Sequence, residues 1–298
     1  MAQSMMLLIN PTAGRATSHA AIGGVVETFC MNGWHPSVFY TGAPGRATLL
    51  AAQYGGDYDV LVCLGGDGTL SETISGLMQL APEKRPRLGY IPMGTANDVA
   101  NTLNLPRRKP IAAAQDVLRG QQMPYDVGQY GADAYFTYVA AFGAFTEVSY
   151  STDQEVKHAL GQAAYVLSSI SYLPKLKSYH TRIEYDGGVL EEELIFGAVS
   201  NSTSVAGMIK LDKRVVALSD GLFELVLVRT PKSLQELNSI VNGLLTQDYN
   251  GPVMSILQTS RVKFTFDEPV PWTRDGENGG EHSELEIRNL HKAVDFIL

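Results

Sequence analysis

A short apolar strand that breaks into a glycine turn and then a helix constrains this chain more than any other feature. Residues 60–64 are wholly apolar and partly β-branched, which is typical of a strand buried on both faces. The turn Gly65-Gly66-Asp67-Gly68-Thr69 follows, and apolar residues then recur at helical spacing, at Leu70, Ile74, Leu77 and Met78. Thr69 and Glu72 form a capping-box pattern, which predicts a helix that begins near Thr69. This arrangement can present backbone N–H groups to a phosphate.

Asp67 adds a condition to that interpretation. A carboxylate inside a phosphate-binding loop repels the phosphate unless a cation lies between them, and Mg²⁺ is the usual mediator. The loop is therefore better suited to a metal-bound nucleotide polyphosphate than to free phosphate. The alternative is an ordinary tight connection between a strand and a helix, with Asp67 exposed by chance.

Strands alternate with helices through about residue 120. The strands are expected at residues 5–9, 35–41, 60–64 and 88–91, and the helices at 18–32, 46–54, from Asp98 onward and at 111–119. This alternation predicts a Rossmann-like α/β domain with a mostly parallel sheet. The loops at 10–15, 41–42, 65–69 and 94–98 would all open at the carboxyl edge of that sheet, where such folds bind ligands.

The second half of the chain has a different texture. Period-two runs occur at residues 134–141, 179–185, 194–200, 223–228 and 261–266, with a hairpin signal at Asp186-Gly187-Gly188. Helices are expected at 153–172 and 233–246, and a last strand at 293–298. The sequence thus predicts a nucleotide-binding domain at 1–122, to which 288–298 return, and a largely antiparallel β-sandwich domain at 123–287. The active site is expected in the cleft between them.

Composition limits the classes of function. The 298 residues carry a formal net charge of −8, which argues against nucleic acid and against strong docking on anionic lipid. The N-terminus lacks a basic region and is expected to form the first strand rather than a secretion signal. Cys30 and Cys63 lie in apolar stretches and have no metal-like spacing, which favours buried, reduced thiols of a cytoplasmic protein.

Two Asp-Gly turns in the second half could carry chemistry or could be turns alone. One is Ser219-Asp220-Gly221, and the other is Asp275-Gly276-Glu277. The second has carboxylates on both sides of a glycine, so one of them could act as a general base while the other binds a cation.

Several motifs together resemble the diacylglycerol kinase catalytic family, which includes bacterial soluble lipid kinases and eukaryotic sphingosine and ceramide kinases. They are NPTAG at residues 10–14, GGDGT at 65–69, GTAND at 94–98 and FGAFTEVSY at 142–150. The resemblance implies an ATP site made of Asn10, Pro11, Thr12, Ala13, Gly14, Thr41, Gly66, Asp67, Gly68, Thr69, Leu70, Ser71, Glu72 and Thr95.

The same resemblance implies roles for acidic residues. Either Asp275 or Glu277, with Glu277 favoured, would take the proton from the lipid hydroxyl, and Asp67, Asp98 and Asp126 would surround a catalytic Mg²⁺. A structural Mg²⁺ would bind Asp220 and the carbonyls of Ala217 and Leu222. The family often has a second Asp where this chain has Ser219, which leaves one acidic ligand on that turn.

The activity implied is ATP-dependent phosphorylation of diacylglycerol to phosphatidate by a cytoplasmic enzyme that contacts the membrane transiently. Another lipid alcohol, such as a sphingoid base or an undecaprenol-type alcohol, is an alternative acceptor, as is NAD. A non-catalytic nucleotide or lipid sensor is a third hypothesis. No Walker lysine motif is present, so backbone amides, Mg²⁺ and Arg15 are the expected phosphate ligands. Residues 160–176 fit either an interfacial amphipathic segment or an ordinary helix, and the sequence is compatible with a homodimer.

Overall fold

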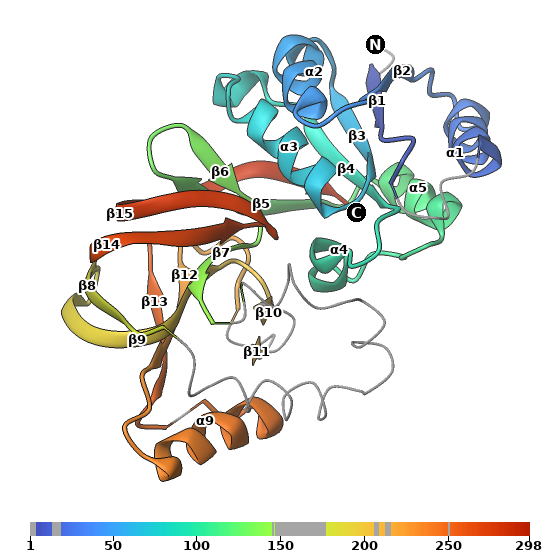
Figure 1. Ribbon diagram of the computed structural model, residues 1–298. Helices are drawn as coiled ribbons and strands as arrows, with labels where there is room; N and C mark the ends of the chain where they lie inside the picture. The colour runs from blue at the N-terminus through green and yellow to red at the C-terminus, as the bar shows by residue number, and fades with distance from the viewer. Residues whose placement is uncertain are drawn as a thin grey trace.

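The computed structural model describes residues 4–13, 19–144, 146, 177–205, 209–211, 216–249 and 251–298 (Figure 1). Its first part is a parallel sheet of four strands in the order β2, β1, β3, β4. These strands are β1 (Met5–Ile9), β2 (Ser37–Tyr40), β3 (Val60–Gly65) and β4 (Arg87–Pro92). All residues of β1 and β3 are buried, as expected for strands covered on both faces.

Helices cover both faces of this sheet. They are α1 (His19–Met31), α2 (Arg46–Tyr54), α3 (Asp67–Leu77), the short α4 (Asp98–Thr102) and α5 (Pro110–Arg119), with 3₁₀ turns at Gly55–Asp57 and Pro82–Lys84. Met6 and Leu8 of β1 pack with α2 and α3, whereas Leu7 and Ile9 pack with α1 and α5. Figure 1 shows these two pairs of helices on opposite sides of the parallel strands.

The second part is antiparallel. Its strands are β5 (Gln122–Tyr130), β6 (Ala134–Phe136), β7 (Val139–Gly143), β8 (Tyr179–Tyr185), β9 (Gly188–Ser200), β10 (Ser204–Val205), β11 (Ile209–Lys210), β12 (Phe223–Arg229), β13 (Met254–Thr259), β14 (Arg261–Arg274) and β15 (Glu277–Ile297). One helix, α9 (Leu234–Thr246), is described in this part. Its interior includes a cluster of aromatic rings, in which the ring centroids of Phe142 and Phe264 lie 4.8 and 5.1 Å from that of Trp272.

The long strand β15 joins the two parts. Its first half pairs with β14, and its end runs parallel to β4, where Phe296 pairs with Leu88. The result is one sheet of 13 strands among the described residues, with the antiparallel part continuing from the parallel part. No helix in the described ranges has the length and apolar character that crossing a membrane requires.

Most expected elements are present, but one capping prediction is wrong, and Cys30, predicted to be buried, is exposed at the end of α1. Strand β1, helix α2 and the hairpin at Asp186-Gly187 lie where the sequence predicted them. However, α3 begins at Asp67, and Glu72 does not form a capping box with Thr69. Its carboxylate instead accepts hydrogen bonds from backbone N–H groups at the start of α2. The run at 134–141 is divided into β6 and β7, and the predicted segments at 153–172 and 160–176 lie outside the described residues.

A buried carboxyl group on β12 supplies a test of the packing. Glu224 is 1% exposed, lies on the face that carries Val226, and has one carboxyl oxygen, Oε2, without a hydrogen-bond partner in the described part of the chain. Burial raises the pKa of Glu224 to about 8, from an ordinary value of 4.5. The contribution of neutral Glu224 to the free energy of unfolding is therefore fully present below pH 4.5, and it is lost as the pH rises through about 8.

We expect Glu224→Gln to raise the melting temperature, because the amide cannot ionise, and we expect the gain to grow between about pH 5 and pH 8. Thermal unfolding monitored by circular dichroism across this range measures the effect, with the exposed Glu83→Gln as a control. A gain that does not change with pH would contradict the assignment of Glu224 as a buried carboxyl with a raised pKa.

Candidate active site

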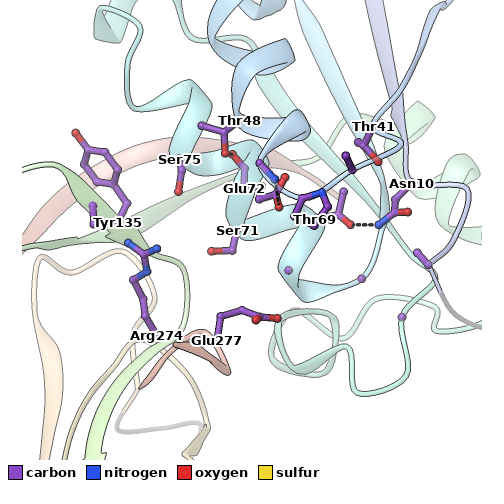
Figure 2. Close-up of a pocket in the computed structure, with 18 of the residues that line it drawn as sticks. Asn10, Thr41, Thr48, Thr69, Ser71, Glu72, Ser75, Tyr135, Arg274 and Glu277 are labelled. Carbon is purple, nitrogen blue, oxygen red and sulfur yellow. Dashed lines mark hydrogen bonds between the residues drawn. The ribbon is translucent and has the colours of Figure 1, made fainter. Parts of the chain in front are cut away.

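The loops after the parallel strands open into one large cavity of about 880 Å³ (Figure 2). One wall comes from the ends of β1 and β2, from the start of α2 and from α3. The other wall comes from Asp133 before β6, from Ala134 and Tyr135 of β6, and from the adjoining ends of β14 and β15, with Arg274 and Glu277. A cavity of this size can hold a nucleotide.

Two glycine loops touch each other at the floor of the cavity. A Cβ atom at Gly94 would lie 2.7 Å from the Cα atom of Gly66, so the backbones can approach this closely only because both residues lack a side chain. Gly66 is the N-cap of α3, and no side chain caps this end of the helix. The first N–H groups of α3 are therefore available to an anion, and the helix dipole favours negative charge there.

Asn10 fixes the first loop to this helix. Its Nδ2 donates a hydrogen bond of 2.9 Å to Thr69 Oγ1, and its Oδ1 accepts bonds from the backbone N–H and the hydroxyl of Thr12. Thr41 is buried at the end of β2, where its N–H donates to the carbonyl of Ile9. These hydrogen bonds hold the loops that follow β1 and β2 in one arrangement before any ligand binds.

Glu72 holds the segment that follows β2. Its two carboxylate oxygens accept the N–H groups of Gly45 and Ala47 at 2.7 and 3.1 Å. Its role is therefore to position this edge of the cavity and to cap α2.

The structure brings together most, but not all, of the predicted nucleotide ligands. Those that line the cavity are Asn10, Thr12, Ala13, Thr41, Gly66, Gly68, Thr69, Ser71 and Glu72. Leu70 is fully buried in the core, and Pro11, Asp67 and Thr95 are not among the described lining residues. Gly14 and Arg15 lie outside the described residues.

Asp67 and Asp98 form a pair of half-buried carboxylates beside the loops. Asp67 accepts hydrogen bonds from the N–H groups of Asp98 and Val99 at 3.1 and 3.4 Å. Burial, with the neighbouring Asp98, raises the pKa of Asp67 to about 6, and burial also raises the pKa of Asp98. A divalent cation would relieve this repulsion, and carboxylate oxygens are the ligands that Mg²⁺ prefers, so the pair fits that ion.

Asp275 and Gly276 form the turn between β14 and β15, and both have a positive φ, as in the type I′ turns of tight hairpins. Asp275 is almost fully buried, and its carboxylate accepts four hydrogen bonds. The donors are the N–H groups of Thr137, Tyr138 and Val139 at 2.7, 2.9 and 3.1 Å, and Ser71 Oγ of α3 at 2.7 Å. This carboxylate is a structural anchor between the turn and α3.

Glu277 has the opposite surroundings. It is exposed, lines the cavity and has no hydrogen bond from its side chain to a described residue. Its Oε1 lies 3.8 Å from the position that a Cβ atom at Gly68 would occupy, so the carboxylate faces the first turn of α3. Figure 2 shows it directed toward that turn. The geometry thus separates two carboxylates that the sequence left as alternatives.

The turn predicted to hold a structural metal, residues 219–221, is not among the residues that line this cavity. Asp220 is exposed, and its Oδ1 accepts the N–H of Leu222 at 3.0 Å, while Ala217 is exposed. The fully buried Asp126 holds this turn through the N–H of Gly221 at 2.7 Å. Within the described ranges, no three His, Cys, Asp or Glu residues gather as a metal site, so the role of Asp220 stays a prediction.

Sequence reasoning missed the far wall of the cavity and the later part of the wall that α3 forms. Ser75 follows Ser71 at helical spacing and therefore shares its side of α3, which the pattern could have indicated, and Gln79 lines the cavity just beyond the end of α3. Arg274 pairs with Glu277 across the hairpin turn, so both side chains lie on one face. No sequence pattern indicated that Tyr135 lines the cavity, because its position depends on how β6 packs beside α3.

Comparisons with known proteins cover nearly the whole chain. Residues 4–130 match the diacylglycerol kinase catalytic domain family, and residues 139–291 match the YegS C-terminal NAD kinase beta sandwich-like domain family. A protein of Bacillus subtilis (strain 168) named diacylglycerol kinase is 33% identical over 98% of this chain and 95% of its own length. A diacylglycerol kinase of Staphylococcus aureus (strain JH9) is 32% identical over 99% of this chain and 92% of its own length.

A solved structure has the same fold. A crystal structure titled as a diacylglycerol kinase from Bacillus anthracis str. Sterne superimposes with a TM-score of 0.79 at 24% identity, over 99% of this chain and 96% of that one. The fold is thus an α/β N-terminal domain followed by a β-sandwich-like C-terminal domain. With matches that extend through both domains, the protein belongs to the diacylglycerol kinase family of lipid kinases.

Proposed function

We propose that this protein transfers the γ-phosphate of ATP to the free hydroxyl of diacylglycerol, giving phosphatidate, in a Mg²⁺-dependent reaction. One observation carries the proposal: the carboxylate of Glu277, which has no partner among the described residues, faces the uncapped N-terminus of α3 across a nucleotide-sized cavity. This arrangement supports a proton acceptor opposite the part of the site best suited to phosphates. The names of the relatives supply the acceptor, since they are called diacylglycerol kinases.

In this reaction Glu277 accepts the proton of the lipid hydroxyl. The hydroxyl oxygen forms a bond to the γ-phosphorus while the bond from that phosphorus to the bridging oxygen of ADP breaks. The N–H groups at the start of α3 stabilise the negative charge on the transferring oxygens. Asp275 takes no part in the proton transfer in this proposal, because its oxygens are occupied by four hydrogen bonds.

Asp67 and Asp98 would hold the Mg²⁺ ion. When bound, Mg²⁺ neutralises charge on the phosphate oxygens, which backbone amides alone do only in part. The two carboxylates fix the ion beside the loop that receives the phosphates, and their mutual repulsion favours an occupied site.

The acceptor also defines where the enzyme works. A diacylglycerol substrate resides in a membrane, so we propose a cytoplasmic protein that contacts the membrane surface transiently. The net charge of −8 gives little general attraction to anionic lipid, so binding of the lipid itself would hold the protein there. A homodimer is compatible with this proposal and is not required by it.

We expect Glu277→Gln to lower phosphate transfer from radiolabelled ATP to diacylglycerol in mixed micelles by about 100-fold to 10,000-fold, because the amide cannot accept the proton. ATP affinity, measured by calorimetry, should not change. Glu281→Gln, which alters the next carboxylate of β15, is the matched control and should keep full activity.

Transfer retained by Glu277→Gln would show that another group is the base. A wild-type protein that binds ATP but leaves diacylglycerol unphosphorylated would overturn the proposed acceptor and favour another lipid alcohol. A protein that binds no ATP would overturn the proposal as a whole.

Asp275→Ala should act on stability rather than on proton transfer. Removing the carboxylate leaves three buried N–H groups and the hydroxyl of Ser71 without their acceptor, at a cost of about 1–3 kcal/mol for each buried donor left unpaired. We expect a clearly lower free energy of unfolding in urea for Asp275→Ala and an unchanged one for Glu277→Gln. A fully stable but inactive Asp275→Ala protein would instead make Asp275 the base.

Asp67→Asn tests the cation site. Because burial and Asp98 raise the pKa of Asp67 from 3.8 to about 6, the stability that its neutral form permits is lost as the pH rises through about 6. Without Mg²⁺ at pH 8, Asp67→Asn should therefore melt at a higher temperature than the wild type. Saturating Mg²⁺ should raise the melting temperature of the wild type and of Asp57→Asn, an exposed control, but not that of Asp67→Asn. Equal stabilisation of all three proteins would contradict this site.

A further inference from the structure

The cavity is longer than its phosphate-binding end. Along α3, the same side of the helix contributes Gly68, Ser71 and Ser75 to the lining. At a rise of about 1.5 Å per residue, Ser75 lies about 10 Å beyond Gly68, a distance that the sugar and phosphates of a nucleotide can span. With the phosphates at the N-terminus of α3, the nucleoside has room beside Ser75.

Arg274 lies on the wall opposite this end. Among the described residues that line the cavity, it has the only cationic side chain, and Tyr135 has the only aromatic one. The guanidinium lies 5.8 Å from the ring centroid of Tyr130, which is within the range of a cation–π contact. It forms no ion pair with a described carboxylate, although Glu277 lies opposite it in the hairpin.

The direction of the side chain separates two possible roles. Figure 2 shows the guanidinium of Arg274 directed toward Tyr135 and the far end of the groove, whereas the carboxylate of Glu277 is directed toward the start of α3. A phosphate ligand would be expected to point toward the glycine loops. Arg274 is thus aimed at the nucleoside half of the groove.

We propose that Arg274 is a positioning residue for the donor, which lies against the nucleobase of ATP on the side opposite Ser75. This inference rests on the proposed ATP site and deepens it. A planar guanidinium stacks well on a flat aromatic base, and its contact with Tyr130 fixes its orientation. The small hydroxyl side chains of Ser71 and Ser75 leave space for a flat base on the other side.

This position is separate from the placement of the proposed base. Arg274 and Glu277 are the two ends of one tight turn, and Asp275 ties that turn to Ser71 of α3. Glu277 therefore keeps its distance from α3 when the side chain of Arg274 is changed. Arg274 would select donors by their base, while the glycine loops bind any polyphosphate.

The test compares two probes, ATP and inorganic tripolyphosphate, each with Mg²⁺, by calorimetry on the full chain. We expect Arg274→Met to weaken ATP binding about threefold to thirtyfold and to leave tripolyphosphate binding unchanged. Arg274→Lys should resemble Arg274→Met, because lysine keeps the charge but lacks the plane. Arg261→Met, at the other end of β14 and paired with Glu286, is the matched control and should bind both probes as the wild type does.

In the transfer assay, Arg274→Met should raise KM for ATP and leave kcat unchanged, because the contact is the same in the ground and transition states. Weaker binding of tripolyphosphate by Arg274→Met would overturn the inference and make Arg274 a phosphate ligand. Unchanged binding of both probes would overturn it as well. Because neither binding measurement uses lipid, failure of the wild type to phosphorylate diacylglycerol would not affect this test, whereas failure of the wild type to bind ATP would overturn the proposed function itself.

Discussion

The carboxylate of Asp275 holds the site together. It accepts hydrogen bonds from three successive N–H groups at residues 137–139 and from Ser71 of α3. Ser71 is separated from Asp275 by 204 positions in the sequence, so this one buried group connects the helix beside the nucleotide loops to the turn that carries Glu277. A buried charge is tolerated here because four donors are directed at its two oxygens. The arrangement of both cavity walls depends on this satisfied carboxylate.

The cavity is otherwise poor in positive charge. Glu72, Asp133 and Glu277 line it, with Arg274 as the only cationic side chain among its described lining residues. In the proposed function, binding a polyphosphate under these conditions would rely on oriented N–H groups at the start of α3 and on a divalent cation. Asp67 and Asp98 repel each other where such a cation would bind, and burial together with this repulsion raises the pKa of Asp67. The same repulsion that destabilises the folded protein without a cation thus favours binding of the cation.

Local patterns in the sequence were sufficient to predict the strands and helices of the first domain, but not the residues of the far wall of the cavity. The apolar run before Gly65 and the helical spacing after it predicted β3 and α3, since both signals depend on neighbouring residues. The partner of Glu72 was assigned wrongly, because Gly45 and Ala47 approach it only after α2 packs against α3. Asp275 and Glu277 could not be separated by sequence. Their difference arises from the backbone N–H groups of residues 137–139, between β6 and the start of β7, which lie 136 to 138 positions away and bind the carboxylate of Asp275.

Helix α3 explains why the two walls can share one ligand. Its N-terminus offers N–H groups that no side chain caps, and the side that lines the cavity carries the small residues Gly68, Ser71 and Ser75. Its other side is fixed against α2 at Gly76, where a Cβ atom would lie 2.4 Å from the carbonyl oxygen of Thr48. The helix cannot shift toward α2, so it is a rigid reference for the phosphate loops and for Ser71 alike. The opposite wall reaches this reference through the bond from Ser71 to Asp275. In the proposed reaction, the position of Glu277 relative to a bound phosphate would therefore be set by packing between helices α2 and α3, at a distance from the reacting atoms.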